Sequence, residues 1–235
     1  MFLFSLLAVS EQTTQTVKWI SVGACVLLLA VIAAIGFFRK TDKNRYDAKR
    51  IAFAGICVGS SFVLALLKFK LAHYGGSITL ASFVPVLLFA YVYGASNGFM
   101  VGLILGLLNF IESPYILTPA TFILDYLLAF TSIGIMGFFS KMPRKDKEAL
   151  PLILGCVCVF FVRFLAHLCS GMIFFLQDEW VSLPAWAMGN AFTYSLIYQC
   201  VYIPADAFIA TMVLLVLAKT GVLSKLTKLM RGKNA

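Results

Sequence analysis

Long apolar runs follow one another along the chain, separated by short polar, glycine-containing or proline-containing segments. The runs are continuous and do not alternate with a period of two, so they predict helices and not the strands of a membrane barrel. Breakers at their ends give seven predicted helices, at about 18–38, 51–70, 78–93, 98–111, 119–140, 150–176 and 187–218. The third and fourth are shorter than the roughly 20 residues of a perpendicular span, so we expect them to be tilted, broken or re-entrant.

The composition places the chain in a membrane. Hydrophobic residues make up 61% of its 235 residues, and the mean hydropathy is +0.95. Surface helices of a soluble domain need a polar face, which these runs lack. We therefore predict an all-α, polytopic membrane protein with an N-terminal transmembrane anchor and basic linker (1–50), a six-helix body that carries the functional site (51–218) and a basic cytoplasmic tail (219–235).

The net charge of +9 is concentrated in three basic clusters, within 39–50, 141–147 and 219–233. Each cluster lies between or after apolar runs, as cytoplasmic segments do under the positive-inside rule. Seven crossings then place the N-terminus outside and the C-terminus in the cytoplasm, and the predicted outer segments contain no Lys or Arg. We expect these clusters to contact anionic membrane lipid and not nucleic acid.

Four ionisable residues lie deep inside the apolar runs: Asp125, Arg163, His167 and Asp206. A charge at the bilayer centre costs about 2.5–3.5 kcal/mol on insertion scales, so such residues are functional candidates by default. Arg163 and His167 are four positions apart and share a helix face, which Gly171 and Phe175 extend. This stripe predicts the floor of a pocket for a flat ligand, with the Asp125 carboxylate either in the pocket or in a structural ion pair with Arg163.

Aromatic residues on the last predicted helix fit the same pocket. Tyr194, Tyr198 and Tyr202 repeat every four positions on one face, and Gln199 lies beside them. Asp206 follows Pro204, where a kinked helix leaves backbone groups that polar neighbours must satisfy, so we expect a structural role for Asp206.

Small residues form two further patterns. Ala52, Gly55 and Gly59 lie on one face of the first body helix, where they permit close packing either within the protein or against a partner subunit. A second set, at positions 98, 102 and 106, is expected to pack internally.

The sequence carries no catalytic motif. It contains no P-loop, no HExxH and no serine elbow, so any ATP-driven step belongs to other subunits. All six cysteines lie in apolar runs and are predicted to be packing residues, neither disulfides nor metal ligands. Two alternatives stay open: an intramembrane acid–base enzyme that uses Asp125, His167 and Asp206, and an assembly subunit without a ligand.

Several of these residues resemble one family in order and spacing. The matching segments are Gly75-Gly76-Ser77, Tyr115-Ile-Leu, Leu124-Asp125-Tyr126, Arg163-Phe-Leu-Ala-His167, Ser170-Gly171, Phe174-Phe175 and Tyr194-Ser195-Leu196. Over about 51–218 the chain is similar to the thiamine-binding S components (the ThiT family) of energy-coupling factor transporters. The N-terminal anchor lies outside this resemblance.

The resemblance implies a non-enzymatic S component of a bacterial cell membrane that binds thiamine from outside. Delivery would proceed through a transmembrane coupling subunit and two ATPase subunits, which use the ATP; the chain itself would need no cofactor. By position, Asp125 would hold the aminopyrimidine, and Ala52, Gly55 and Gly59 would contact the coupling subunit. The other implied pocket residues are Tyr115, Tyr126, Arg163, His167, Gly171, Phe175, Tyr194 and Gln199.

Two positions depart from the family pattern. Gln199 stands where the family has Asn, and Thr121 stands where Gln is usual. Both replacements keep the polarity and change the reach of the side chain, so a thiamine precursor or another flat heterocycle is an alternative ligand.

Overall fold

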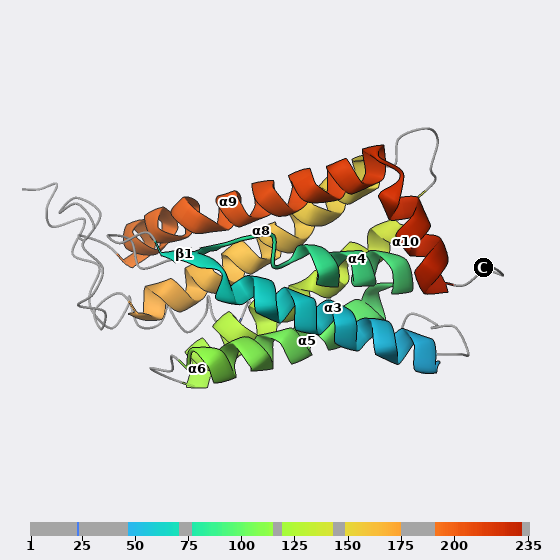
Figure 1. The fold of residues 1–235 in the computed structure, drawn as a ribbon. Helices are drawn as coiled ribbons and strands as arrows, with labels where there is room; N and C mark the ends of the chain where they lie inside the picture. Colours follow the sequence, from blue (N-terminus) through green and yellow to red (C-terminus); the bar gives the residue numbers. More distant parts are fainter. Residues whose placement is uncertain are drawn as a thin grey trace, which may run out of the picture.

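The computed structural model describes residues 47–70, 77–114, 119–142, 149–174 and 191–231, together with Gly23. Apart from Gly23, the predicted anchor lies outside these residues. The described part is a bundle of helices that run along one common axis (Figure 1). Five helical segments are long and apolar enough to cross a membrane, and a sixth, shorter apolar helix lies among them. The predicted all-α, polytopic membrane fold is therefore confirmed.

The elements follow one another along the chain as a six-segment bundle with one small hairpin. In order they are α3 (Ala48–Leu66), β1 (Lys68–Lys70), β2 (Ser77–Thr79), α4 (Val84–Tyr93), α5 (Ala95–Glu112), α6 (Pro119–Phe122), η1 (Ile123–Leu128), α7 (Ala129–Thr131), η2 (Ser132–Lys141), α8 (Ala149–Phe174), α9 (Ala191–Lys219) and α10 (Val222–Arg231). The four elements from α6 to η2 form one helical segment, in which η1 is a π-helix and η2 a 3-10 helix.

The predicted helices at 51–70 and 78–93 were too long: the first was wrong at its C-terminal end and the second at its N-terminal end. The first ends at Leu66 and the second begins only at Val84, because β1 and β2 between them pair as an antiparallel hairpin. The strand residues find polar partners on other elements, Lys68 on α5 and Thr79 on α9. A proline in the first turn of α4 fits this late start, since its missing N–H has no helical partner there.

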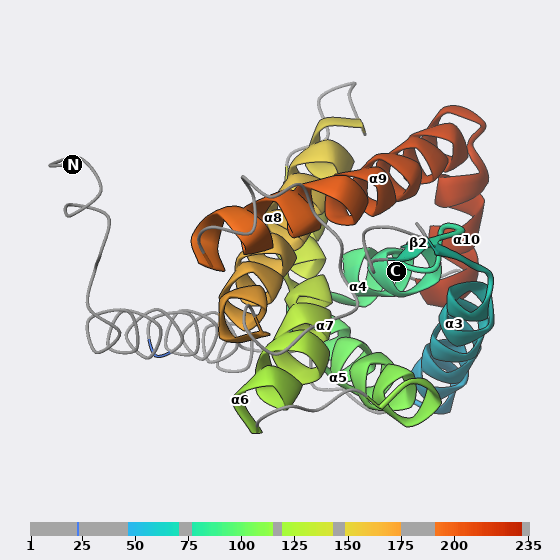
Figure 2. The ribbon, with the colours of Figure 1, turned by 90° about the vertical axis from the view of Figure 1, so that its left-hand side faces the viewer.

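α4 is a half-length helix inside the bundle. It occupies the half of the bundle nearer α10 (Figure 1), and a view along the axis shows α3, α5 and α9 around it (Figure 2). Val86, Leu87 and Ala90 have no exposed surface. Because neighbours cover it on every side, α4 is apolar all round, as expected of a fully buried helix.

Glycines bring α5 against the backbone of the neighbouring helical segment. A Cβ built on Gly102 would lie 2.3 Å from the carbonyl oxygen of Phe130, and one on Gly106 would lie 2.1 Å from that of Tyr126. Only residues without a side chain allow backbones to approach so closely. The predicted internal packing of these glycines is confirmed, and their contacts lie on and just after the π-helical turn.

The predicted tail at 219–235 contains an ordered helix. α10 lies across the end of the bundle (Figure 1), with Leu223 and Met230 buried. The Arg231 guanidinium donates hydrogen bonds of 3.2 and 2.9 Å to the carbonyl oxygen of Val92, at the end of α4. The lysines of this segment suggested a simple tail, whereas its apolar residues at helical spacing pack it onto the body.

Candidate functional site

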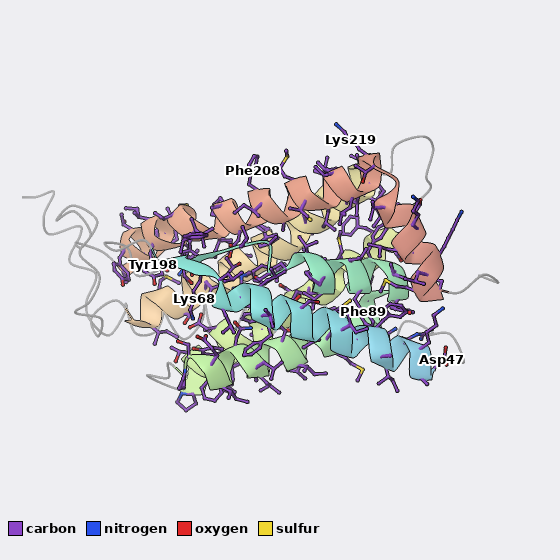
Figure 3. All side chains as sticks on the ribbon, viewed as in Figure 1. Asp47, Lys68, Phe89, Tyr198, Phe208 and Lys219 are labelled. Atoms are coloured by element: carbon purple, nitrogen blue, oxygen red, sulfur yellow. The ribbon has the colours of Figure 1, made fainter. Side chains whose placement is uncertain are left out.

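A cavity of about 280 Å³ lies where the hairpin replaces the missing half of α4. Lys68 and Tyr198 line it, at the end of the bundle opposite Asp47 and Lys219 (Figure 3). Its walls come from α3, the hairpin, α5, η1, α7, α8 and α9. The lining residues are Ala65, Lys68, Ser77, Thr79, Ser82, Phe83, Leu105, Asn109, Glu112, Ser113, Asp125, Tyr126, Phe130, Arg163, His167, Ser170, Gly171, Tyr194, Tyr198, Gln199, Tyr202 and Asp206.

The Asp125 carboxylate is held by two side chains of α8. One oxygen lies 2.7 Å from His167 Nδ1, and the other accepts a 2.5 Å hydrogen bond from the Ser170 hydroxyl. Asp125 lies on the π-helical turn η1, a rare conformation that often marks functional sites. The alternative of an ion pair between Asp125 and Arg163 is wrong, because Asp125 pairs with His167, while the Arg163 guanidinium lies against Phe83 and Phe130.

Arg163 lies on the cavity wall, between two aromatic rings. Its guanidinium carbon is 4.5 Å from the ring centroids of both Phe83 and Phe130, a double cation–π contact. The residue is 8% exposed, and its Nη1 has no hydrogen-bond partner among the described residues. Buried polar atoms are nearly always paired in native proteins, so an unpaired donor at a cavity wall is a candidate ligand contact.

His167 also presents an unpaired nitrogen. Its Nδ1 faces Asp125, while Nε2 is buried and has no partner among the described residues. In a neutral imidazole whose Nδ1–H donates to the carboxylate, Nε2 is an acceptor. The cavity wall therefore offers one buried acceptor at His167 and one buried donor at Arg163, which together suit a flat heterocycle with both kinds of group on its edge.

α9 supplies an aromatic wall. The rings of Tyr194 and Tyr198 stack with centroids 6.1 Å apart, and the Tyr198 and Tyr202 rings meet edge to face at 5.5 Å. Tyr202 in turn lies edge to face with the His167 ring, at 6.3 Å. All three tyrosines line the cavity, as their spacing on one helix face predicted. Their π-faces are suited to a planar or cationic ligand.

Gly171 lies at the seam between α8 and α9. A Cβ built on it would be 2.3 Å from the Ser195 hydroxyl, which donates a 2.7 Å hydrogen bond to the carbonyl oxygen of Leu168. The predicted stripe implied that the Gly171 backbone would lie uncovered on the pocket floor, and this detail is wrong because Ser195 packs against it. Gly171 still lines the cavity, and its missing side chain lets α9 approach α8.

Sequence reasoning missed the hairpin side of the cavity. Lys68 and Glu112 form an ion pair of 2.8 Å across 44 positions. The Asp206 carboxylate accepts bonds from the Thr79 backbone N–H at 2.9 Å and the Thr79 hydroxyl at 3.2 Å. Asp206 thus has the structural role that was expected, although it serves β2 and not the kinked backbone near Pro204. No local pattern links such distant positions.

Three other positions discussed from the sequence are not among the described lining residues of the cavity. Tyr115 and Phe175 lie outside the described residues. Thr121 is fully buried and does not line the cavity, so of the two departures from the family pattern only Gln199 lies at the cavity.

The structure gives no indication of redox or metal chemistry within the described part of the chain. The cysteines at 57, 156, 158, 169 and 200 carry free thiols, and none lines the cavity. The described His, Cys, Asp and Glu residues form no group of three or more that could hold a metal ion.

Comparison with known proteins relates the whole body of the chain to one family. The sequence model of a family described as thiamine transporter protein matches residues 51–225. The thiamine transporter ThiT of Bacillus subtilis (strain 168) is 32% identical over 154 residues, which cover 62% of this chain and 77% of the relative. A solved structure of ThiT from Listeria monocytogenes superposes with a TM-score of 0.59 at 22% identity, over 73% of this chain and 93% of that one, and shows the same fold.

Proposed function

Because this chain belongs to the thiamine transporter family, we propose that it is the substrate-binding S component of an energy-coupling factor importer for thiamine. It binds thiamine, or a close analogue, from outside the bacterial cell and passes it on through a coupling subunit and two ATPases. Family membership identifies a multi-pass membrane transport protein and not an enzyme, so the alternative of intramembrane acid–base catalysis is wrong.

The chemistry of the cavity is the main support for thiamine as the ligand. The aminopyrimidine ring carries donors and acceptors on its edge, which match the Asp125 carboxylate, His167 Nε2 and Arg163 Nη1. The thiazolium cation suits the aromatic rings of Tyr126 and Tyr194, which line the cavity. A cation also offsets the cost of keeping a carboxylate in the membrane.

The proposed ligand contacts extend beyond these five side chains. Gly171 and Gln199 lie at the same wall of the cavity, and Tyr115 and Phe175, assigned from sequence alone, would complete the pocket. If the ligand differs from thiamine, Gln199 is the position that would accommodate the difference, because it is longer than the Asn of the family pattern.

The coupling subunit is proposed to dock on the outer face of α3. Ala52, Gly55 and Gly59 are exposed, and a Cβ built on either glycine meets no atom within 4 Å. Packing within the described residues therefore does not account for these small residues. α3 is also the least buried of the candidate spans, at 17% of its apolar window, which leaves a face on which another helix can pack closely.

Charge supports an orientation in which the cavity opens outward. One end of the bundle carries a basic group that comprises Lys49, Arg50, Lys219, Lys225, Lys228 and Arg231. The cavity is at the other end, where Lys68 is neutralised by Glu112 (Figure 3). By the positive-inside rule we propose that the first end is cytoplasmic, with the C-terminus inside and, given the predicted anchor, the N-terminus outside.

Calorimetric titration of the purified protein with thiamine tests this function. We expect Asp125→Asn to weaken binding at least about 10-fold, because hydrogen bonds to charged groups contribute about 1.5–3 kcal/mol each. Asp47→Asn makes the same chemical change at an exposed position at the far end of the bundle and should leave affinity unchanged. A wild-type protein that binds no thiamine would refute the proposal, and equal affinities of all three proteins would remove Asp125 from the site.

A further inference from the structure

A chain of hydrogen bonds runs from α9 to the backbone of His167. The Tyr202 hydroxyl donates to Gln199 Oε1, and Gln199 Nε2 donates to the carbonyl oxygen of His167 at 3.1 Å. On the far side of His167, Nδ1 faces the Asp125 carboxylate at 2.7 Å. Tyr202, Gln199 and His167 are therefore linked in series, with the candidate ligand atom His167 Nε2 near the end of the series.

The direction of each bond in this chain is fixed by chemistry. A carbonyl oxygen only accepts, so the atom of Gln199 that faces His167 must be its NH₂ group. The amide oxygen of Gln199 then faces Tyr202, and because that oxygen also only accepts, the Tyr202 hydroxyl must donate. Removal of the hydroxyl would leave the Gln199 oxygen without this partner and the amide free to rotate away from His167.

Gln199 is tightly packed, so a change in the orientation of its amide would disturb the residues around it. Gln199 is 3% exposed, and its Nε2 would lie 3.3 Å from a Cβ on Gly171, so the amide fills the seam between α8 and α9. The Tyr202 ring also meets the His167 ring edge to face. Tyr202 thus contacts His167 through its ring and restrains it a second time through Gln199.

We infer that Tyr202 is a positioning residue of the ligand site, whose hydroxyl acts through the Gln199 amide to hold His167 in its binding position. This inference rests on the proposed function, since the ligand used to test it is thiamine. It also gives Gln199 a role that a shorter Asn side chain could not perform in the same way, because the amide spans from Tyr202 to the α8 backbone.

The test is a double-mutant cycle in thiamine affinity. Tyr202→Phe removes the hydroxyl and keeps the ring, and we expect binding to weaken about 3- to 10-fold, the range for one hydrogen bond. Gln199→Met keeps the length and removes both polar atoms. If Tyr202 acts through Gln199, adding Tyr202→Phe to Gln199→Met should change the affinity no further.

Tyr93→Phe is the matched control. Its hydroxyl donates a 2.6 Å bond to the carbonyl oxygen of Met230, at the opposite end of the bundle. Loss of this bond should lower the unfolding temperature of the ligand-free protein about as much as Tyr202→Phe does, with thiamine affinity unchanged.

The outcomes separate the inference from the function on which it rests. No thiamine binding by the wild-type protein would overturn the proposed function. Wild-type binding with unchanged affinity of Tyr202→Phe would overturn the inference alone. Effects of Tyr202→Phe and Gln199→Met that add in full would also overturn it, because they would show that Tyr202 acts independently of Gln199.

Discussion

The same substitution, glycine to alanine, should have opposite effects on two helices of this protein. At Gly59 on α3 the new methyl group meets no atom within 4 Å. Alanine is favoured over glycine inside a helix by about 0.5–1 kcal/mol, so Gly59→Ala should be slightly stabilising. At Gly106 on α5 the methyl group would lie 2.1 Å from the Tyr126 carbonyl oxygen and 3.0 Å from the Phe130 Cβ. Overpacking of this kind costs about 1–3 kcal/mol, which exceeds the gain in helix propensity.

The net loss for Gly106→Ala is about 1–2 kcal/mol, which corresponds to a fall of about 2–8 °C in unfolding temperature for a chain of this size. Thermal unfolding of the purified variants in one detergent measures both changes. Gly106→Ala should also weaken thiamine binding, because the displaced carbonyl belongs to the neighbour of Asp125 on η1. An unfolding temperature for Gly106→Ala at or above that of wild type would refute the close approach of α5 to the π-helical turn.

Three further predictions concern parts of the protein away from the cavity. Gly55→Leu should leave calorimetric affinity unchanged and abolish thiamine uptake in cells that supply the coupling subunit and ATPases; retained uptake would place the docking face elsewhere. Deletion of residues 1–45 removes no described cavity residue, so affinity should persist, and loss of binding by an inserted, monodisperse protein would make the anchor part of the site. Arg231→Ala removes two bonds to Val92 and should lower the unfolding temperature by about 2–4 °C at unchanged affinity, whereas an unchanged temperature would show that α10 is not fastened there.

Local patterns were sufficient to predict one wall of the cavity. Arg163 and His167 share a helix face by spacing alone, and the four-residue repeat of Tyr194, Tyr198 and Tyr202 places their rings on one side of α9. The cost of an ionisable group in a membrane marked Asp125 as a functional candidate. Each of these inferences needs only the spacing of residues within one helix or the apolar surroundings of one charged residue. Both can be read directly from the sequence.

The opposite wall depends on pairings that no local pattern encodes. Thr79 and Asp206 are 127 positions apart, and their hydrogen bonds join α9 to β2, a strand where the sequence predicted the start of a helix. Hydropathy cannot distinguish the two, because a short apolar run is compatible with either. The helical spacing of Leu223 and Met230 was visible in the sequence, but the lysines between them suggested a solvated tail.

The half-length α4 has a consequence for how this architecture can diversify. A full-length helix contacts its neighbours along the whole bundle, so changing its outer half would disturb every helix around it. Here the described residues between Leu66 and Val84 form a small hairpin, which bonds to the helices at Glu112 and Asp206. The hairpin sequence can therefore be replaced as a unit, and the replacement changes one wall of the cavity. An exchange that keeps Lys68 and Thr79 would preserve the bonds of the hairpin to α5 and α9.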